Sequence, residues 1–338
     1  MIIAFLDLLG FSNLIENDLF TARDNLSIFN DVLRTKVIDA KCHPVSEYNE
    51  KNGLRNFAEN SAVTSFNYLI SISDSLIIGA NNPDLFVRQL SNFVSTIFID
   101  YTEPFEKPFE NIDSVTTNQR GEWIINSDGK GKFFPYRSFP LLFRGGITYG
   151  DDVSFNKEGS IWNNEYQLSG VNVSGLSYVR AVKLESSDIG PRLFCDKKFV
   201  EKLCDIDVKR SIRCLKNDLY EIVWTYFGCE AAVKEGSVMR NAYKRIESFF
   251  LPRAINLYSY YCKIESAKDQ KSNSESRICQ QYDEFIKLIC RGILQYVSCN
   301  GKPDDVSRII KIINEKLENI GNKYIWRLDC EELKSFLG

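Results

Sequence analysis

The chain has 338 residues, of which 44% are hydrophobic and 26% charged, so it has the composition of a soluble globular protein and is long enough for one substantial core and a second, smaller unit. Its formal net charge of −3 provides no global basic field for DNA, RNA or an anionic membrane, so any phosphate binding must depend on local groups. The single histidine, His43, disfavours a histidine-based zinc site, and none of the ten cysteines forms a C-x-x-C pair. We therefore expect carboxylates and cations to carry any chemistry, and the cysteines to be buried and reduced.

The N-terminus is apolar over residues 1–6, but Asp7 interrupts this run at once. No positively charged segment and no small-residue cleavage site accompany it, which disfavours a signal peptide. No stretch approaches the ~20 apolar residues that a membrane-spanning helix needs. We expect a cytoplasmic protein without a membrane span.

The first 80 residues are predicted to alternate strands and helices. Residues 2–9 are nearly all apolar, as in a strand buried on both faces of a sheet, and Gly10-Phe11-Ser12 turns the chain into a helix. Apolar residues at helical spacing indicate a longer helix over residues 20–39. Residues 68–78 contain two apolar runs joined by Ser73-Asp74-Ser75, which is the pattern of a β-hairpin.

The next segment starts with a helix and then changes character. Asn82-Pro83 combines an N-cap residue with a proline at the first helical position, which predicts a helix start. Residues 102–140 hold four of the nine prolines and are interpreted as an insertion, in which Asp128-Gly129 can turn a small hairpin. Beyond it we expect strand at 141–143 and in the segment 144–150, a helix at 175–185, and strands at 192–195 and 219–224.

From about residue 236 the pattern is only helical. Apolar residues recur at helical spacing over 242–262, 278–298 and 304–319, and a serine-rich linker at 266–276 separates the first two. The sequence thus predicts an α+β domain over residues 1–230 and a helical C-terminal extension over 231–338.

Two aspartates stand out from apolar surroundings. Asp7 lies in a buried strand, where an ionised carboxylate is costly unless it is paired or binds a metal. The glycine turn after it has free backbone N–H groups at a helix start, which favour a phosphate. Asp74 lies at the tip of an apolar hairpin, and two such carboxylates side by side would require cations, as in a two-Mg²⁺ site for a triphosphate. Taken singly, each aspartate is also consistent with an ordinary turn.

Four motifs in order give a more specific resemblance. They are Asp7 to Ser12, Ser73-Asp74, Arg144 to Gly150, and Gly175 to Glu185. In this order the chain resembles, over about residues 1–230, the catalytic domain of class III nucleotidyl cyclases. It is most similar to the Pycsar-type pyrimidine cyclases of bacterial phage defence, which also have Ser-Asp at the hairpin and a strand like Pro191-Arg192-Leu193. The resemblance implies a ferredoxin-like α+β fold with a central, mainly antiparallel sheet flanked by helices.

The resemblance also implies roles for individual residues. Asp7 and Asp74 would hold two Mg²⁺ or Mn²⁺ ions per site, with the carbonyl of Leu8 completing one metal site. The backbone amides of Gly10, Phe11 and Ser12 would bind the β- and γ-phosphates. The enzyme would convert UTP or CTP to cUMP or cCMP and pyrophosphate, and a separate effector would sense the product. Because each site in the family is built from two chains, a head-to-tail homodimer is implied.

Two positions on the 175–185 helix depart from the family pattern. The family has an asparagine and an arginine there for the ribose and the transition state, and this chain has Val179 and Lys183. Lys183 keeps the positive charge without the bidentate geometry of arginine. Arg180 and Arg144 are therefore candidate replacements.

The base-reading positions depart as well. Ile70, four residues before the hairpin aspartate, has no group that can hydrogen-bond to a base edge, and Asn172 stands where its usual partner would be. The loss of this pair argues against ATP or GTP as preferred substrate. Asn172 and Arg144 remain as candidate contacts to a pyrimidine.

Three functions are consistent with these residues. Retention of both aspartates favours an active pyrimidine cyclase, which is the function we expect. Val179 and Lys183 favour a cyclase-fold regulatory module that binds a nucleotide without turning it over, and a purine cyclase would keep the chemistry but change the product. Left open are the choice between uracil and cytosine, the activating trigger, and the roles of the insertion and the helical tail.

Overall fold

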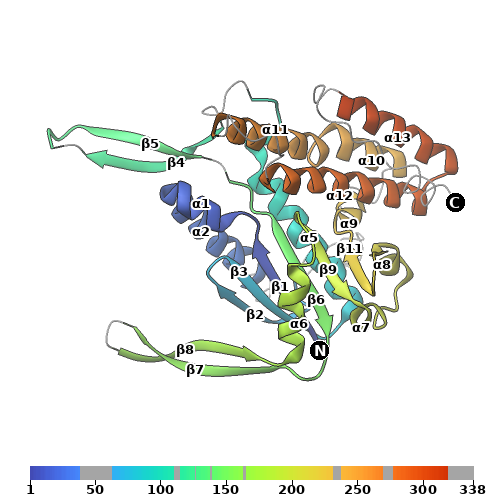
Figure 1. Ribbon diagram of the computed structural model, residues 1–338, viewed down its shortest axis with the longest axis horizontal. Helices are drawn as coiled ribbons and strands as arrows, with labels where there is room; N and C mark the ends of the chain where they lie inside the picture. Colours follow the sequence, from blue (N-terminus) through green and yellow to red (C-terminus); the bar gives the residue numbers. More distant parts are fainter. Residues whose placement is uncertain are drawn as a thin grey trace, which may run out of the picture.

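The computed structural model describes residues 1–38, 63–109, 115–125, 127–137, 139–162, 165–230, 237–268 and 277–318. Within these ranges the chain forms a seven-stranded sheet with the order β10-β11-β9-β6-β1-β3-β2 and two separate two-stranded hairpins (Figure 1). The strands of the large sheet are β1 (Ile2–Leu8), β2 (Phe66–Ile72), β3 (Ser75–Ala80), β6 (Phe143–Tyr149), β9 (Leu193–Asp196), β10 (Ile212–Cys214) and β11 (Leu219–Ile222). The helices nearest to it in sequence are α1 (Phe11–Asn17), α2 (Leu19–Val32) with a π-helical continuation (Leu33–Ile38), α5 (Pro83–Tyr101), a 3₁₀ turn (Glu103–Phe105), α6 (Leu176–Glu185), α7 (Lys197–Val200) and α8 (Ile206–Arg210).

Four strands of the sheet have ferredoxin-like topology. In chain order β1, β2, β3 and β6 alternate with α1–α2 and α5 as β-α-β-β-α-β, and they are arranged as β6-β1-β3-β2. All three pairings among them are antiparallel, whereas β9 joins β6 in parallel after the crossover through α6. The predicted α+β fold with a mainly antiparallel central sheet is confirmed.

Alternation along β1 assigns its side chains to the two faces of the sheet. Even-numbered residues of β1 belong to the main hydrophobic core. On this face Phe143 of β6 contacts Phe29 of α2 and Phe93 of α5, with ring centroids 5.9 and 6.0 Å apart. Phe5 points to the other face and packs against α6. Asp7 has the same parity as Phe5, so it also lies on the α6 face.

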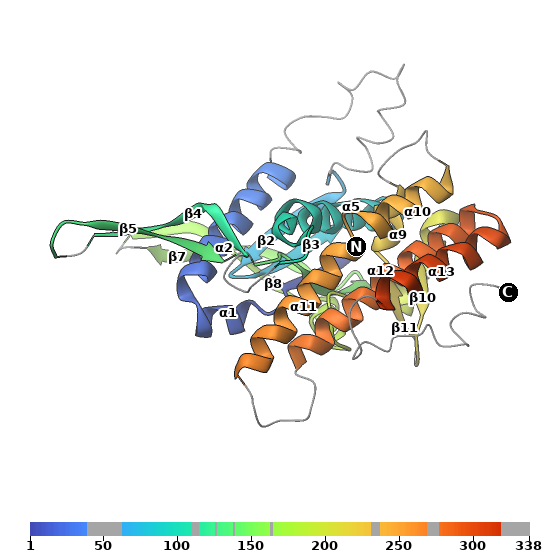
Figure 2. The same ribbon diagram turned by 90° about the horizontal axis from the view of Figure 1, so that it is seen from above.

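Two long hairpins extend from the same side of the body, as both views show (Figures 1 and 2). The first consists of β4 (Thr116–Ile125) and β5 (Gly131–Arg137), and its turn at Gly129 has a φ of +75°, so the hairpin predicted within the insertion is confirmed. The second consists of β7 (Ser154–Trp162) and β8 (Glu165–Ser174). The sequence pattern did not predict this second hairpin.

The C-terminal part of the described chain is helical, as predicted. Its helices are α9 (Thr225–Glu230), α10 (Val238–Glu247), α11 (Leu251–Lys268), α12 (Arg277–Asn300) and α13 (Pro303–Glu318). They pack on the sheet domain through α5, where Phe98 contacts Phe285 of α12, and through Trp224, which directly precedes α9 and stacks on the same ring. Buried residues of both parts form one continuous core.

The single helix suggested by the spacing over 242–262 is wrong in detail. The structure has two helices, because Phe249 adopts a left-handed φ of 67° between α10 and α11. Pro252 then stands in the first turn of α11, the place in a helix where a missing N–H costs nothing. Apolar spacing continues across the break and conceals it.

Among the described residues no helix is long and apolar enough to cross a membrane. The cysteines whose side chains are described are free thiols, and most are at least partly buried, but Cys204 and Cys214 are exposed, contrary to the expectation. His43 and most of the serine-rich linker, residues 269–276, lie outside the described residues.

Candidate active site

The two predicted metal aspartates lie together at one end of the sheet. Asp7 pairs in register with Ser75 of β3, next to Asp74 in the hairpin turn. The Ser75 hydroxyl donates to Asp7 Oδ1 at 2.9 Å, and the Leu8 amide donates to the Asp74 carbonyl at 3.1 Å. Burial, and next the negative charge of Asp7, raise the pKa of the Asp74 carboxyl above its ordinary value of 3.8. The two carboxylates therefore repel each other in a partly dry position.

Arg144 links Asp7 to a third carboxylate. It lies opposite Asp7 in the register of β1 and β6, and its Nε and Nη2 donate to Asp7 Oδ2 at 3.3 and 3.1 Å. The same Nε forms an ion pair with Glu185 at the end of α6, which is buried. Burial raises the pKa of Glu185, and the nearby Arg144 opposes this rise. Arg144 thus neutralises part of an acidic cluster that comes from three separate segments.

The donor set at this position fits magnesium or manganese bound together with a phosphate. In the part of the chain that the structure describes, no group of three or more His, Cys, Asp or Glu side chains is arranged to hold a metal. Mg²⁺ is, however, commonly bound through one or two carboxylates with substrate phosphates and waters completing its shell. Asp7 and Asp74 supply two such oxygen ligands, and their mutual repulsion would be relieved by a cation.

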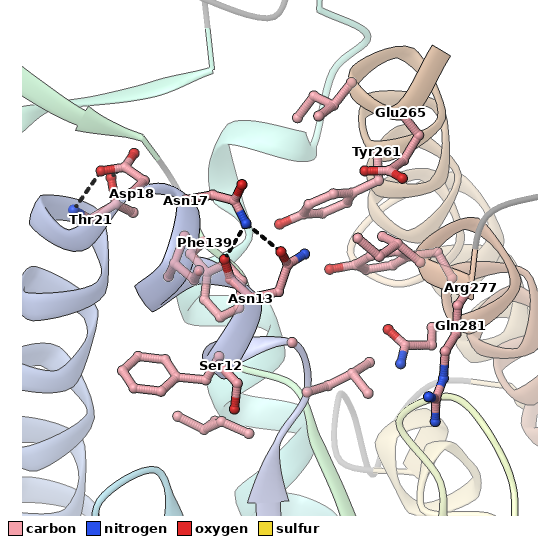
Figure 3. A pocket seen from close by; sticks show the side chains of 18 of the residues that line it. Ser12, Asn13, Asn17, Asp18, Thr21, Phe139, Tyr261, Glu265, Arg277 and Gln281 are labelled. Atoms are coloured by element: carbon pink, nitrogen blue, oxygen red, sulfur yellow. Dashed lines mark hydrogen bonds between the residues drawn. The ribbon is translucent and has the colours of Figure 1, made fainter. Parts of the chain in front are cut away.

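A cavity of about 700 Å³ opens beside Asp7, whereas Asp74 is not among the residues that line it (Figure 3). One side consists of the end of β1, the following turn and α1. Its other side is formed by α11 and α12, and Phe139 and Arg144 also contribute. The volume lies within the usual range for small-molecule sites.

The turn between β1 and α1 has the form that the sequence predicts. Gly10 adopts a left-handed φ of 80°, and no side chain caps the N-terminus of α1. Phe11 is buried and anchors the helix in the core, while Gly10, Phe11 and Ser12 all line the cavity. The predicted phosphate-binding residues and Asp7 are therefore neighbours of one cavity.

The predicted transition-state residues lie elsewhere in the same chain. Lys183 and Arg180 are exposed on the outer face of α6, and Val179 is 44% exposed there. Arg180 lines a second cavity of about 480 Å³ with Lys198 and Lys202, near the opposite end of β1 from Asp7. None of these residues lines the cavity beside Asp7.

The two base-reading positions are separated as well. Ile70 is opposite Ile77, which in turn is opposite Phe5, so this register places Ile70 on the same face of the sheet as Asp7. Asn172 lies on the β7–β8 hairpin, where its side-chain amide donates to Glu158 at 2.8 Å. It does not line the cavity beside Asp7.

Several residues of the site were not anticipated. Glu185 is the last residue of the cyclase-like motif Gly175 to Glu185, but only the fold shows that it pairs with Arg144. The α11–α12 side of the cavity includes two stacked tyrosines, Tyr261 and Tyr282, with Arg277 and Gln281. These residues follow ordinary helical patterns in a region without a motif, so no sequence signal identified them.

We found no match to a protein-family model or to a curated protein. Two solved structures described as adenylate cyclases from Trypanosoma brucei in their monomeric state are similar to this chain. Both have 12% sequence identity and a TM-score of 0.35. The similarity covers 66% of this chain and 89% of the other for the first, and 65% and 86% for the second.

Proposed function

We propose that this protein is a nucleotidyl cyclase that converts UTP or CTP to the 3′,5′-cyclic nucleotide and pyrophosphate. The observation that carries the proposal is the position of Asp7 and Asp74 side by side at the end of the sheet, where Asp7 and the Gly10–Ser12 turn line one cavity. The order of the cyclase-like motifs along the chain supports it. The raised pKa of Asp74 is what a carboxylate awaiting a cation would have.

In this proposal the side chains bind and orient the triphosphate. Asp7, Asp74 and the Leu8 carbonyl would hold Mg²⁺ or Mn²⁺, which supplies charge neutralisation at the phosphates and acidifies the ribose 3′-hydroxyl. The backbone amides of Gly10, Phe11 and Ser12 would hold the β- and γ-phosphates. The 3′-oxygen bonds to the α-phosphorus as the bond from that phosphorus to the bridging oxygen breaks, and a proton and pyrophosphate leave.

Arg144 would act as a movable counter-charge. In the absence of a cation its guanidinium offsets the charge of Asp7. Once a cation takes over that role, Arg144 can remain with Glu185 or turn to the substrate. Arg144 lines the cavity, which supports its proposed contact to the nucleotide.

A head-to-tail homodimer would complete the site. Arg180 lies near the opposite end of β1 from Asp7, and both Arg180 and Lys183 are exposed and available to a second copy. On the same face of the sheet, Tyr68 and Ile72 of the edge strand β2 are 45% and 51% exposed. An open apolar face beside Ile70 is suited to an interface that encloses a base.

The pyrimidine preference and the messenger role are extensions of the resemblance. Ile70 offers no hydrogen bond to a purine edge, and Asn172 would approach the base from the second copy. The product would act through a separate cyclic-nucleotide-sensing effector, in defence against phage.

The test is a cyclisation assay. The purified protein is incubated with ATP, GTP, CTP or UTP in Mg²⁺ or Mn²⁺, and products are identified by mass. We expect cUMP or cCMP, and we expect Asp7→Asn and Asp74→Asn to lower the rate more than about a hundredfold, because bound metal contributes several kcal/mol at the transition state.

The matched control is Asp31→Asn, the same change on the exposed face of α2, which should leave the rate unaltered. A cyclic purine product would correct the base preference but leave the chemistry intact. If no triphosphate is cyclised but metal-dependent nucleotide binding is retained, the protein is a nucleotide-binding regulatory module and not an enzyme.

A further inference from the structure

The hairpin of α11 and α12 forms a wall of the cavity beside the aspartates. From α11 the lining residues are Tyr260, Tyr261, Ile264 and Glu265, and from α12 they are Arg277, Ile278, Gln281 and Tyr282. Tyr261 and Tyr282 stack with ring centroids 4.5 Å apart, and they join the two helices. The wall is therefore built from two packed helices, although it lies more than 230 residues from the Gly10 turn in sequence.

Charge is unevenly distributed along the cavity. Ser12 is in the first turn of α1, directly after β1, whereas Asp18 follows the far end of α1. Figure 3 shows Arg277 and Gln281 across from Ser12, with Asp18 and Glu265 at the other end. The Asp18 carboxylate accepts hydrogen bonds from the amide and hydroxyl of Thr21, so it is engaged in capping α2.

Arg277 differs from the other cation at this cavity. Arg144 is paired with Asp7 and Glu185. For Arg277, no ion pair or hydrogen bond is formed with any of the residues in the described ranges, and its side chain is exposed to the cavity. Gln281 follows it by one helical turn and so presents its amide beside the guanidinium.

We infer that Arg277, assisted by Gln281, binds the terminal phosphate of a triphosphate held at the Gly10–Ser12 turn of the same chain. This inference rests on the proposed function. A guanidinium presents several N–H donors in a fork that matches phosphate oxygens, and an arginine without an ion pair to any described residue gives up none of these on binding. The helical extension thereby becomes part of the substrate site.

The test measures phosphate binding apart from catalysis and from base recognition. Inorganic tripolyphosphate with Mg²⁺ is titrated into the full-length protein by calorimetry. We expect Arg277→Gln to weaken binding about tenfold, because a charge-assisted hydrogen bond is lost. Arg277→Lys should give an intermediate loss, since it keeps the charge but not the fork.

Arg240→Gln is the matched control. Arg240 is also an exposed arginine in the first turn of a C-terminal helix, and it does not line this cavity. The inference is overturned if Arg277→Gln binds tripolyphosphate as tightly as the unmodified protein does. It is also overturned if the unmodified protein does not bind tripolyphosphate. If cyclisation proceeds and Arg277→Gln leaves KM unchanged, only this inference fails. If no triphosphate is cyclised but Arg277→Gln still weakens tripolyphosphate binding, only the proposed enzyme activity fails.

Discussion

Asp74 has a carboxyl group whose ionised form the fold disfavours. Its carboxyl is partly buried and faces the charge of Asp7, and both effects raise its pKa. Hydrogen bonds to the backbone of Asp74 and to the side chain of Ser73 oppose this rise, and so does the charge of Arg144, which is already engaged with Asp7 and Glu185. A carboxylate that lowers stability in this way is typical of a functional position rather than a structural one.

We predict that Asp74→Asn stabilises the metal-free protein. Because the folded state binds the Asp74 proton more tightly than the unfolded state does, stability falls as pH rises from the ordinary pKa of 3.8 through the raised folded pKa. The variant lacks this titration, so its advantage should be absent below pH 3.8, grow as pH rises through the raised folded pKa, and stay constant above it. Thermal melts in EDTA across pH measure it.

Added Mg²⁺ should remove this advantage, since a cation favours the ionised carboxylate and stabilises the folded state that binds it. Asp31→Asn serves again as control, because its carboxylate is exposed. A melting temperature of Asp74→Asn at or below that of the unmodified protein in EDTA at pH 7 would show that Asp74 stabilises the fold instead.

The element that sets the geometry of the acidic cluster is α6. It lies so close to β6 that a Cβ on Gly146 would overlap the backbone carbonyl of Ala181 and come within 2.6 Å of the backbone nitrogen of Glu185. This contact holds the end of α6 against the sheet. Glu185 can reach Arg144 because Gly146 places no side chain between β6 and the end of α6.

We predict that Gly146→Ala lowers the free energy of unfolding by about 3 kcal/mol, since backbone atoms cannot yield to the added methyl group without moving the helix. Urea denaturation followed by circular dichroism measures the change. Gly170→Ala is the comparison, because its Cβ would lie at an easier 3.3 Å from Glu158. Equal effects of the two substitutions would mean that α6 is free to shift.

At the scale of the molecule, residues proposed to act together lie near opposite ends of strand β1. Asp7 and Asp74 lie at one end of β1, and Arg180 lies near the other. Head-to-tail pairing of two copies would create two sites, each with the aspartates of one chain and the cations of the other.

We predict that two inactive variants restore activity when they are unfolded and refolded together. Asp7→Asn lacks a metal ligand, and the double variant Arg180→Ala/Lys183→Ala lacks the cations. In an equal mixture half of the dimers are mixed and each has one intact site, so we expect about one quarter of full activity. Asp7→Asn mixed with Asp74→Asn should remain inactive, because both lesions affect the same half-site. No recovery in the first mixture would contradict the composite site.

Local patterns in the sequence determined the elements. The apolar run before Asp7, the Ser73-Asp74-Ser75 turn and the Asn82-Pro83 helix start depend on backbone preferences over a few residues, and the structure has them where they were expected. The hairpin β7–β8 was missed because apolar and polar residues alternate only weakly along its sequence. The break at Phe249 was missed because apolar spacing continues through it.

Only the tertiary structure decided which of these elements meet. Asp7, Arg144 and Glu185 are far apart in the chain and come together because β1 pairs with β6 and α6 packs across both. The position of Arg277 across the cavity from the Gly10 turn depends on the packing of the C-terminal helices against α5 and α9. This packing buries large aromatic rings and does not depend on the chemistry of the residues that remain outside. Burial of apolar surface is not directional, so a sequence can show that a helix has an apolar face but not which site its remaining residues will adjoin.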